Sequence, residues 1–287
     1  MYRDVSVVLP TTGRPELSRA VRSLLEQTAT NVQVLVVIDG GTSLPAIPRS
    51  SSVSVITNRG PGTASAARNS GIAAADADLV TFLDDDDWVT SEHVASTLER
   101  MKDASPSDCW VTGVTGMGAD HTERYERVPP DLSPRGRHWS LSTEMSWAQS
   151  LTKLTLFAPK VALEEVNGFD ESFRTREWTE LFWRLNAIVN IRGSDQVTYR
   201  RTVWDASLSK SHLGGLRENR AMDFRRLIKK HHRLLRQHKP GFTRTLREHA
   251  RRCRSDGLTL ESGRTRLRLE ALRFNPNDYQ CMMCKPA

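Results

Sequence analysis

The sequence predicts an α/β fold in which a mostly parallel sheet is flanked by helices. Two observations predict it. Across the first hundred residues, short apolar runs alternate with segments whose apolar residues recur at helical spacing. The apolar runs are hydrophobic on both faces, which is typical of parallel strands buried between two layers of helices. The 287 residues allow one large α/β domain with an appendage, or two modest domains.

Local signals place each element in this first part. Val32–Ile38 is almost wholly apolar, which predicts a buried strand, and Pro10 ends an earlier strand of the same kind. Pro15 is well placed to open a helix, because the first helical position needs no backbone N–H. The pattern predicts strands at 5–10, 32–38, 52–57 and 79–83, and helices at 15–27, 62–75 and 91–102.

The pattern is looser in the next hundred residues. Residues 116–150 are rich in Pro, Gly, Arg and Trp without a clear period, which predicts loops and short strands that face a substrate. After them we expect a strand at Leu151–Phe157, a helix at Glu177–Val189 and an edge strand at Gln196–Arg200.

A basic, mainly helical extension is expected from residue 216 to the end. Pro240-Gly241 is predicted to separate two amphipathic helices, and Gly257 to end the second. The formal charge is +7 with a pI of about 9.5, and the positive excess lies beyond Arg200. Such a segment can meet nucleic acid, anionic lipid or a phosphorylated substrate, or be a solvated face. It lacks interleaved aromatic residues, so we expect no specific nucleic-acid partner.

The composition predicts a cytoplasmic protein without a transmembrane segment. No apolar run approaches the roughly 18 to 20 residues that span a bilayer. The apolar run near the N-terminus has only six residues, which is too short for a signal peptide. Cys281 and Cys284 form a lone CxxC, and no second pair completes a zinc site, so reduced thiols are expected.

Four adjacent aspartates, Asp84–Asp87, follow the strand predicted at 79–83. Two carboxylates about 4 Å apart repel by roughly 4 kcal/mol at an effective dielectric near 20. A hard divalent cation such as Mg²⁺ or Mn²⁺ would remove that repulsion, whereas a solvated acidic turn would only weaken it. The loop at 10–14 and Asp39 also follow strands. Because ligands of parallel sheets bind beyond the carboxyl ends of the strands, these features are expected to converge on one site.

Seven short segments carry a resemblance to a known family through their order and spacing. They are Val5–Thr11, Leu24–Thr28, Val36–Gly40, Ala67–Ile72, Phe82–Trp88, Leu163–Glu171 and Leu181–Leu185. Through them the chain resembles the family 2 glycosyltransferases of the GT-A fold over roughly residues 3–212. The resemblance implies a Rossmann-like GT-A domain at 1–215, with a donor half at about 1–102 and an acceptor half at about 103–215. Residues 216–287 would form the extension.

The same resemblance implies a donor site for a nucleotide-diphosphate sugar. A UDP-sugar is favoured, because Asp39 can accept a hydrogen bond from the imino group of uracil. Mn²⁺ or Mg²⁺ would be held by Asp86, with Asp84 and His212 as further ligands. The residues expected to bind the nucleotide-sugar are Pro10, Thr11, Thr12, Arg14, Asp39, Arg68, Asp84 and Asp85.

A general base is expected at the start of the helix after Gly168-Phe-Asp-Glu171. An inverting transferase of this family usually has an Asp there, whereas this chain has Glu177 and Glu180 and no Asp. Glu177 is the first candidate for the base and Glu180 the second. Alternatively Glu177 only stabilises the helix N-terminus, or the acceptor is a group that deprotonates easily.

The acceptor is unidentified: a small metabolite, a peptide and a phosphorylated lipid all fit. The transferred group would be a hexosyl or N-acetylhexosaminyl unit.

Two other functions stay open at this point. One is a nucleotidyltransferase, which also pairs an acidic metal site with a parallel sheet. The other is a non-catalytic GT-A-like protein that binds nucleotides or polyanions. The oligomeric state is not indicated.

Overall fold

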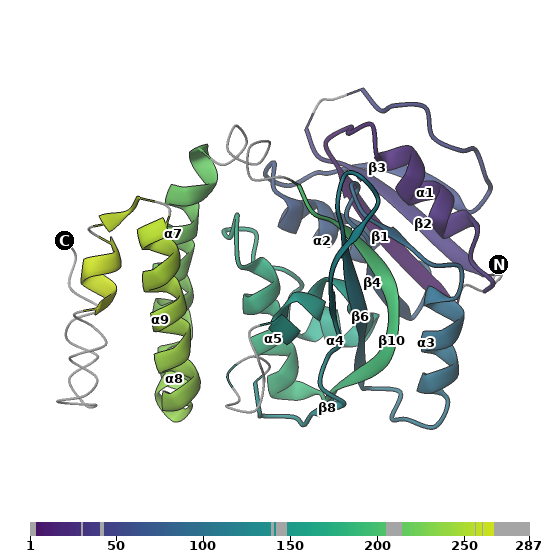
Figure 1. The fold of residues 1–287 in the computed structure, drawn as a ribbon. Helices are drawn as coiled ribbons and strands as arrows, with labels where there is room; N and C mark the ends of the chain where they lie inside the picture. Colours follow the sequence, from purple (N-terminus) through teal and green to yellow (C-terminus); the bar gives the residue numbers. More distant parts are fainter. Residues whose placement is uncertain are drawn as a thin grey trace.

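The computed structural model describes residues 4–29, 31–40, 43–138, 141, 148–204, 214–255, 257–259 and 261–266. Helices cover both faces of one mixed sheet (Figure 1). The strands are β1 Val5–Thr11, β2 Val32–Ile38, β3 Val53–Thr57, β4 Leu79–Phe82, β5 Trp88–Val89, β6 Cys109–Met117, β7 Glu123–Arg127, β8 Leu132–Ser133, β9 Phe157–Pro159 and β10 Ile191–Thr202. The helices are α1 Leu17–Leu25, α2 Ala64–Ala74, α3 His93–Met101, η1 Ala148–Thr155, α4 Lys160–Glu165, α5 Glu177–Ile188, α7 Gly214–Lys230, α8 His232–Gln237 and α9 Lys239–Ser255.

The sheet follows the order β3-β2-β1-β4-β9-β6-β10-β5. Its first four strands are parallel, β9 is antiparallel to both neighbours, and β10 is parallel to β6. One core lies between this sheet and α2, α4 and α5, and a second lies against α1 and α3 (Figure 1). The predicted α/β fold with a mostly parallel sheet is confirmed. It could be predicted because apolar strands alternate along the sequence with helices that have one apolar face.

The parallel part of the sheet brings three strand ends together. The backbone N–H of Asp39 donates to Thr11 O at 2.8 Å, and that of Leu83 donates to Val8 O at 3.1 Å. The ends of β1, β2 and β4 therefore lie at one edge of the sheet, where the loop at 10–14 and the four aspartates follow them.

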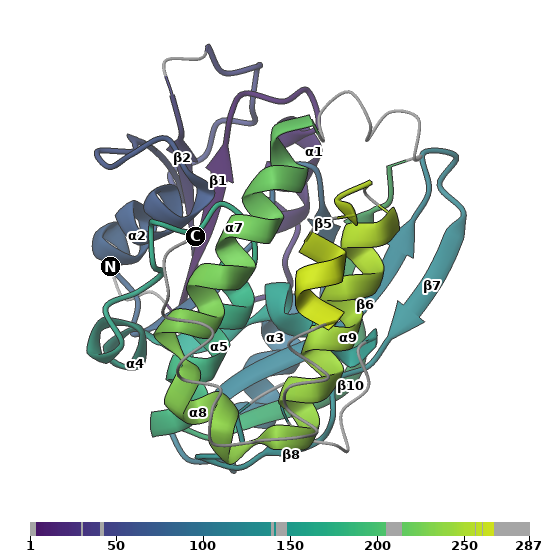
Figure 2. The same cartoon turned by 90° about the vertical axis from the view of Figure 1, so that its left-hand side faces the viewer.

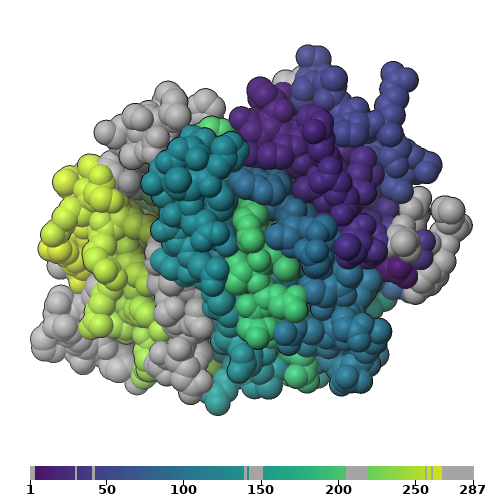
Figure 3. Space-filling view, turned by 45° about the vertical axis from the view of Figure 1, so that its right-hand side comes forward, coloured from purple at the N-terminus to yellow at the C-terminus, as the bar shows by residue number. Residues whose placement is uncertain are grey.

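The second half of the sheet differs from the sequence prediction in two elements. The strand expected at 151–157 is wrong: η1 occupies most of that stretch, and Thr155 Oγ1 donates to Thr112 O at 3.0 Å. The strand expected at 196–200 is confirmed as part of β10, but its edge position is wrong, because β10 has 12 residues and pairs with both β6 and β5. Figure 3 shows part of β10 in green between teal and blue segments. Register shifts between Gly193 and Tyr199 disturb its alternation, which hides the strand in the sequence.

The chain is helical from 214 to 255, as expected. The predicted break near Pro240 lies two residues earlier, at His238, because Pro240 is in the first turn of α9, where a missing N–H is tolerated. A further interruption near His231 was not predicted. Figure 2 shows α7 and α9 side by side. Buried residues of these helices join Phe173 and Trp183 in a third core, so α7–α9 are attached to the α5 side of the molecule. In the described part of the chain, no helix has both the length and the apolarity that crossing a membrane requires.

Helix α2 approaches β1 closely at Gly71. A Cβ atom added there would lie 2.2 Å from Val8 Cγ1 and 2.8 Å from Val8 Cγ2. We therefore expect Gly71→Ala to lower the free energy of unfolding by about 1 to 3 kcal/mol through overpacking. Urea denaturation measures this loss. The double variant Val8→Ala/Gly71→Ala is expected to be less destabilised than the sum of its single variants, and strict additivity would contradict this contact.

Candidate functional site

A cavity of about 270 Å³ opens at the carboxyl edge of the parallel strands. It contains every residue that the sequence predicted for the nucleotide-sugar, together with the predicted metal ligand Asp86. Only Ala64 was not predicted. The structure thus brings these residues together, while their roles stay predictions. The lining residues are Pro10, Thr11, Thr12, Arg14, Asp39, Ala64, Arg68, Asp84, Asp85 and Asp86.

The loop after β1 is tied to the second aspartate. Thr11 Oγ1 donates to Asp85 Oδ2 at 2.7 Å, and Arg14 Nε lies 3.7 Å from Asp85 Oδ1. Burial raises the pKa of Asp85, although the Thr11 hydrogen bond and the Arg14 charge oppose that shift. Thr11 also accepts a hydrogen bond from the Gly13 N–H at 2.9 Å, so one hydroxyl organises both the loop and the acidic turn.

Asp86 is held by partners distant in sequence. Arg14 Nη1 donates to Asp86 Oδ2 at 2.9 Å, and Trp204 Nε1 donates to the same oxygen at 2.9 Å. Arg19 Nη2 donates to the Asp86 backbone carbonyl at 2.7 Å, and Arg19 stacks on the ring of Trp88. Two side chains therefore fix the Asp86 carboxylate at the cavity wall, and a third holds its backbone carbonyl.

The fourth aspartate points away from the cavity. Asp87 is 3% exposed, and it accepts hydrogen bonds from Tyr199 OH at 2.8 Å and from the Thr202 N–H at 2.7 Å. Burial, with the nearby charges of Asp84 and Asp86, raises the pKa of Asp87 well above its usual range. Asp87 therefore anchors the acidic turn to β10. Sequence reasoning missed Tyr199 and Trp204, since nothing near them along the chain marks them as part of the site.

A buried arginine joins this cavity to the first turn of α5. Arg68 Nη2 lies 2.7 Å from Asp84 Oδ1, and Arg68 Nη1 lies 3.4 Å from Glu177 Oε1. The Arg68 side chain is only 4% exposed, and its guanidinium lies over the rings of Trp178 and Phe169 at 4.9 and 5.4 Å. Burial opposes its charge, but Asp84 and Glu177 raise the pKa of Arg68. Glu177 therefore contacts a residue that lines the cavity.

Glu177 itself is in a largely enclosed position. Its side chain is 17% exposed. Burial raises the pKa of Glu177, while Arg68 opposes the shift. The preceding residue, Arg176, has a φ of 64°, a left-handed conformation that is uncommon outside glycine. A carboxylate with a raised pKa beside a cavity suits proton transfer.

The structure does not support Glu180 as a base. Its side chain is 0% exposed, and the carboxylate forms ion pairs with Arg184 and with Lys230 Nζ at 2.8 Å. His231 Nε2 lies 3.0 Å from the same carboxylate. Burial would raise the pKa of Glu180, but His231, Arg184 and Lys230 lower it to about 2. A carboxylate so strongly held is a weak base, and it links α5 to α7 and α8 instead.

The carboxylate of Asp39, which follows β2, is oriented by a neighbouring side chain. Its Oδ1 accepts from Asn58 Nδ2 at 2.8 Å, and Asn58 Oδ1 accepts from the Gly60 N–H at 2.9 Å. The asparagine therefore orients the carboxylate and shapes the loop beyond β3. Asn58 was not predicted, although it follows a predicted strand as Asp39 does.

The carboxylates of Asp84 and Asp86 fit a hard divalent cation in their chemistry. Both offer oxygen atoms to the same cavity, and Mg²⁺ is commonly held by one or two carboxylates together with substrate phosphates and water. Within the described residues, no set of three or more His, Cys, Asp or Glu side chains completes a metal site. His212, the third predicted ligand, lies outside the described residues, as do Cys281 and Cys284.

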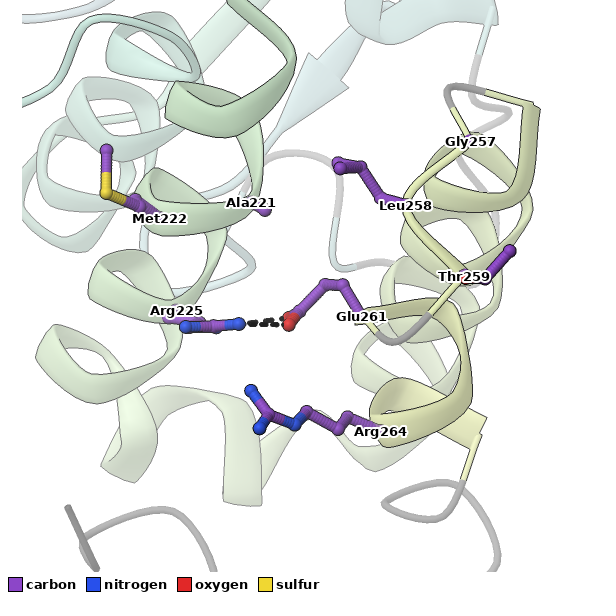
Figure 4. Close-up of a pocket in the computed structure, with 8 residues that line it drawn as sticks. All are labelled: Ala221, Met222, Arg225, Gly257, Leu258, Thr259, Glu261 and Arg264. Carbon is purple, nitrogen blue, oxygen red and sulfur yellow. Dashed lines mark hydrogen bonds and ion pairs between the residues drawn. The ribbon is translucent and has the colours of Figure 1, made fainter. Parts of the chain in front are cut away.

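A second cavity, of about 400 Å³, lies between α7 and residues 257–264 (Figure 4). Ala221, Met222 and Leu258 line it, and Arg225 and Glu261 form an ion pair across it. It contains none of the four aspartates. This cavity belongs to the packing of the C-terminal helices and not to the site at the sheet edge.

Comparison with known proteins gives a family match. The model of the family described as Glycosyl transferase family 2 matches residues 6–155. The Pre-mycofactocin glycosyltransferase of Mycobacterium tuberculosis (strain ATCC 25618 / H37Rv) is 28% identical over 191 residues, which cover 64% of this chain and 39% of that protein. The uncharacterized glycosyltransferase EpsJ of Bacillus subtilis (strain 168) is 29% identical over 136 residues, 45% of this chain and 38% of that protein. The chain thus matches about two fifths of the length of these relatives.

Solved structures show the same fold. The S. aureus TarS 1-349 structure in complex with UDP-GlcNAc aligns with a TM-score of 0.57 and 16% identity, over 98% of this chain and 90% of that one. The TarS 1-349 complex with UDP aligns with a TM-score of 0.55 and 17% identity over the same shares. At this identity the likeness concerns the fold.

Proposed function

The chain belongs to glycosyltransferase family 2, and on that premise we propose that it transfers a hexosyl or N-acetylhexosaminyl group from a nucleotide-diphosphate sugar to an acceptor nucleophile. A UDP-sugar is the favoured donor, since UDP and UDP-GlcNAc are the ligands named for the structurally similar TarS. Family membership favours this activity over that of a nucleotidyltransferase. The sugar would change its anomeric configuration, because one direct displacement inverts the attacked carbon.

The observation that carries the proposal is the connection from Asp84 through Arg68 to Glu177. One buried guanidinium contacts a carboxylate of the donor cavity and the candidate base. A displacement needs these two functions next to each other, because the acceptor attacks the carbon from which the diphosphate departs. In this proposal the cavity holds the donor, and Glu177, which contacts the cavity residue Arg68, takes the proton.

Each side chain has a separate role in the proposed reaction. Asp39 accepts a hydrogen bond from the base of the nucleotide, and Arg14 and Arg68 stabilise negative charge on the departing diphosphate. Glu177 Oε accepts the proton of the acceptor as the new bond forms, which is typically worth 10² to 10⁴ in rate. Asp86 and Asp84 would hold Mn²⁺ or Mg²⁺, which supplies further charge neutralisation at the diphosphate when bound.

Calorimetric titration with UDP and with GDP, each with and without Mn²⁺, tests the donor half. We expect UDP to bind, and to bind more tightly with Mn²⁺. Asp86→Ala is expected to remove most of the Mn²⁺-dependent gain, because it deletes an oxygen ligand at the cavity. Asp103→Ala, which removes an exposed aspartate, is the matched control and should keep wild-type affinity.

Two results would contradict the proposal. Absence of binding to either nucleotide under every metal condition would remove the donor site. Formation of pyrophosphate from UTP and a sugar phosphate, without release of UDP from a UDP-sugar, would indicate a nucleotidyltransferase.

A further inference from the structure

The positive charge of this protein is concentrated in three helices. Residues 214–255 contain fourteen Lys and Arg against three Asp and Glu, a net charge of +11, whereas the whole chain has +7. The rest of the chain is therefore net acidic. Such a concentration opposes folding through self-repulsion. We propose that α7–α9 form a binding surface for a polyanionic acceptor, a chain with repeated phosphate or carboxylate groups.

Helix α9 presents the clearest part of this surface. Arg247, Arg251 and Arg254 are exposed, and none of them forms an ion pair with another described residue. Their i, i+4, i+7 spacing places them on one side of the helix, with rises of roughly 6 and 4.5 Å between successive residues. Like charges at this spacing destabilise an isolated helix, so the stripe is not explained by the stability of α9. Repeated anions along a flexible polymer match such a row of cations.

Further cations extend the surface at its lower end. Arg233 and Arg236 of α8 are exposed, and within the described chain they too are without an ion-pair partner. By contrast Arg225 is neutralised by Glu261 beside the second cavity (Figure 4). The charge available to a ligand therefore lies on the exposed sides of α8 and α9, which meet at the bottom of Figure 2.

The side chains favour a polymer without bases or acyl chains. A single-stranded nucleic acid needs exposed aromatic rings for stacking, but Phe224 and Phe242 are 0% and 2% exposed. A membrane-surface helix needs an apolar face, whereas Met222 is the one large apolar side chain on these helices, among those described, that is markedly exposed. Charge without an apolar or aromatic component suits an extended polyanion.

The basic helices are attached to the segment that leads into the candidate base. Asp223 of α7 accepts hydrogen bonds from the N–H groups of Arg174 and Thr175 at 3.0 and 2.8 Å, and from Thr175 Oγ1 at 3.0 Å. The guanidinium of Arg176 lies 4.8 Å from the Phe224 ring. Glu177 follows directly. Arg176 Nη2 also lies 3.5 Å from Nδ1 of His249 in α9, so a polymer held on α9 would be bound to a helix that contacts the segment leading into Glu177. The acceptor role of the bound polymer rests on the proposed transferase activity.

Fluorescence anisotropy with labelled linear polyphosphate, measured over a range of NaCl concentrations, tests the surface. The variant Arg247→Gln/Arg251→Gln/Arg254→Gln is expected to bind at least about tenfold more weakly. Its slope of log K against log salt should be smaller by about 2, since each lost phosphate contact contributes roughly 0.7. The control Arg22→Gln/Arg49→Gln/Lys102→Gln removes the same charge from exposed residues elsewhere and should retain wild-type binding.

Equal loss in both triple variants would overturn the proposal, because net charge alone would then explain binding. Binding to anionic phospholipid vesicles without binding to polyphosphate would also overturn it, in favour of a membrane. Both variants should keep wild-type affinity for UDP in calorimetry. Loss of UDP binding would therefore indicate a failure of the donor site, whereas loss of polyphosphate binding alone would indicate a failure of this surface.

A transfer assay tests whether the bound polymer is the acceptor. With radiolabelled UDP-N-acetylglucosamine and a mixed polymer extract, label should enter the fraction that an anion-exchange column retains. The α9 variant should reduce that incorporation, while its release of UDP to water stays unchanged. Label confined to the unretained fraction would contradict a polyanionic acceptor.

Discussion

The Glu177→Gln variant is expected to lose about 10²- to 10⁴-fold in turnover while its affinity for UDP stays near that of the wild type. Glutamine keeps the shape of the side chain and can still approach Arg68, but it cannot accept a proton at neutral pH. Turnover is measured as UDP release in the presence of acceptor, and affinity by calorimetry. A loss of turnover without a loss of affinity for UDP would identify proton transfer, and not donor binding, as the step in which Glu177 acts.

The pH dependence gives a second measure of the same role. Burial raises the pKa of Glu177, so its base form is lost at a higher pH than that of an ordinary glutamate. Wild-type turnover should therefore fall as the pH decreases through this raised value, and the Gln variant should lack that limb. Glu165→Gln, at an exposed position of α4, is the control. Near-normal turnover of Glu177→Gln would show that another group, or an acceptor that is already deprotonated, performs this step.

Glu180→Gln is expected to lower the free energy of unfolding at pH 7 by about 3 kcal/mol. The carboxylate is fully buried among Arg184, Lys230 and His231, and these partners lower its pKa from 4.5 to about 2. A carboxylate with a depressed pKa in the folded state stabilises the fold above its unfolded pKa. That contribution is lost as the pH falls from about 4.5 towards 2. Urea denaturation at several pH values measures it.

The difference between wild type and Glu180→Gln should therefore be about 2 kcal/mol smaller at pH 3 than at pH 7. Glu99→Gln is the matched control, because Glu99 forms an exposed i, i+3 ion pair with Lys102 and such pairs contribute little. A difference below 1 kcal/mol at pH 7, or one that does not change between pH 7 and pH 3, would contradict the network as a stabilising element.

Much of the donor site could be predicted from local patterns. A strand that is apolar on both faces must be buried in a parallel sheet, and the polar residues that follow such strands collect at its carboxyl edge. The loop after β1, Asp39 and the acidic turn reached the same cavity for this reason. Arg68 needed the family resemblance as well, because it lies in the interior of α2 and not at a strand end.

The differing environments of Glu177 and Glu180 could not be predicted in this way. They are three residues apart on one helix, and both are carboxylates in its first turn. Glu177 contacts Arg68, which lies 109 positions earlier, whereas Glu180 contacts Lys230 and His231 about 50 positions later. Which of them keeps a carboxylate suited to accept a proton depends on these distant partners.

The sequence by itself thus determined the fold class, the first four strands and the cavity residues that follow strand ends, because hydrophobic periodicity and strand ends are local properties of the chain. The tertiary structure alone decided that Asp87 turns inward to Tyr199, that Asp86 is held by Trp204, and that Glu177 contacts Arg68. These contacts join residues more than a hundred positions apart. Their orientation follows from the packing of β10 and α5 against the first half of the sheet, for which no local pattern carries a signal.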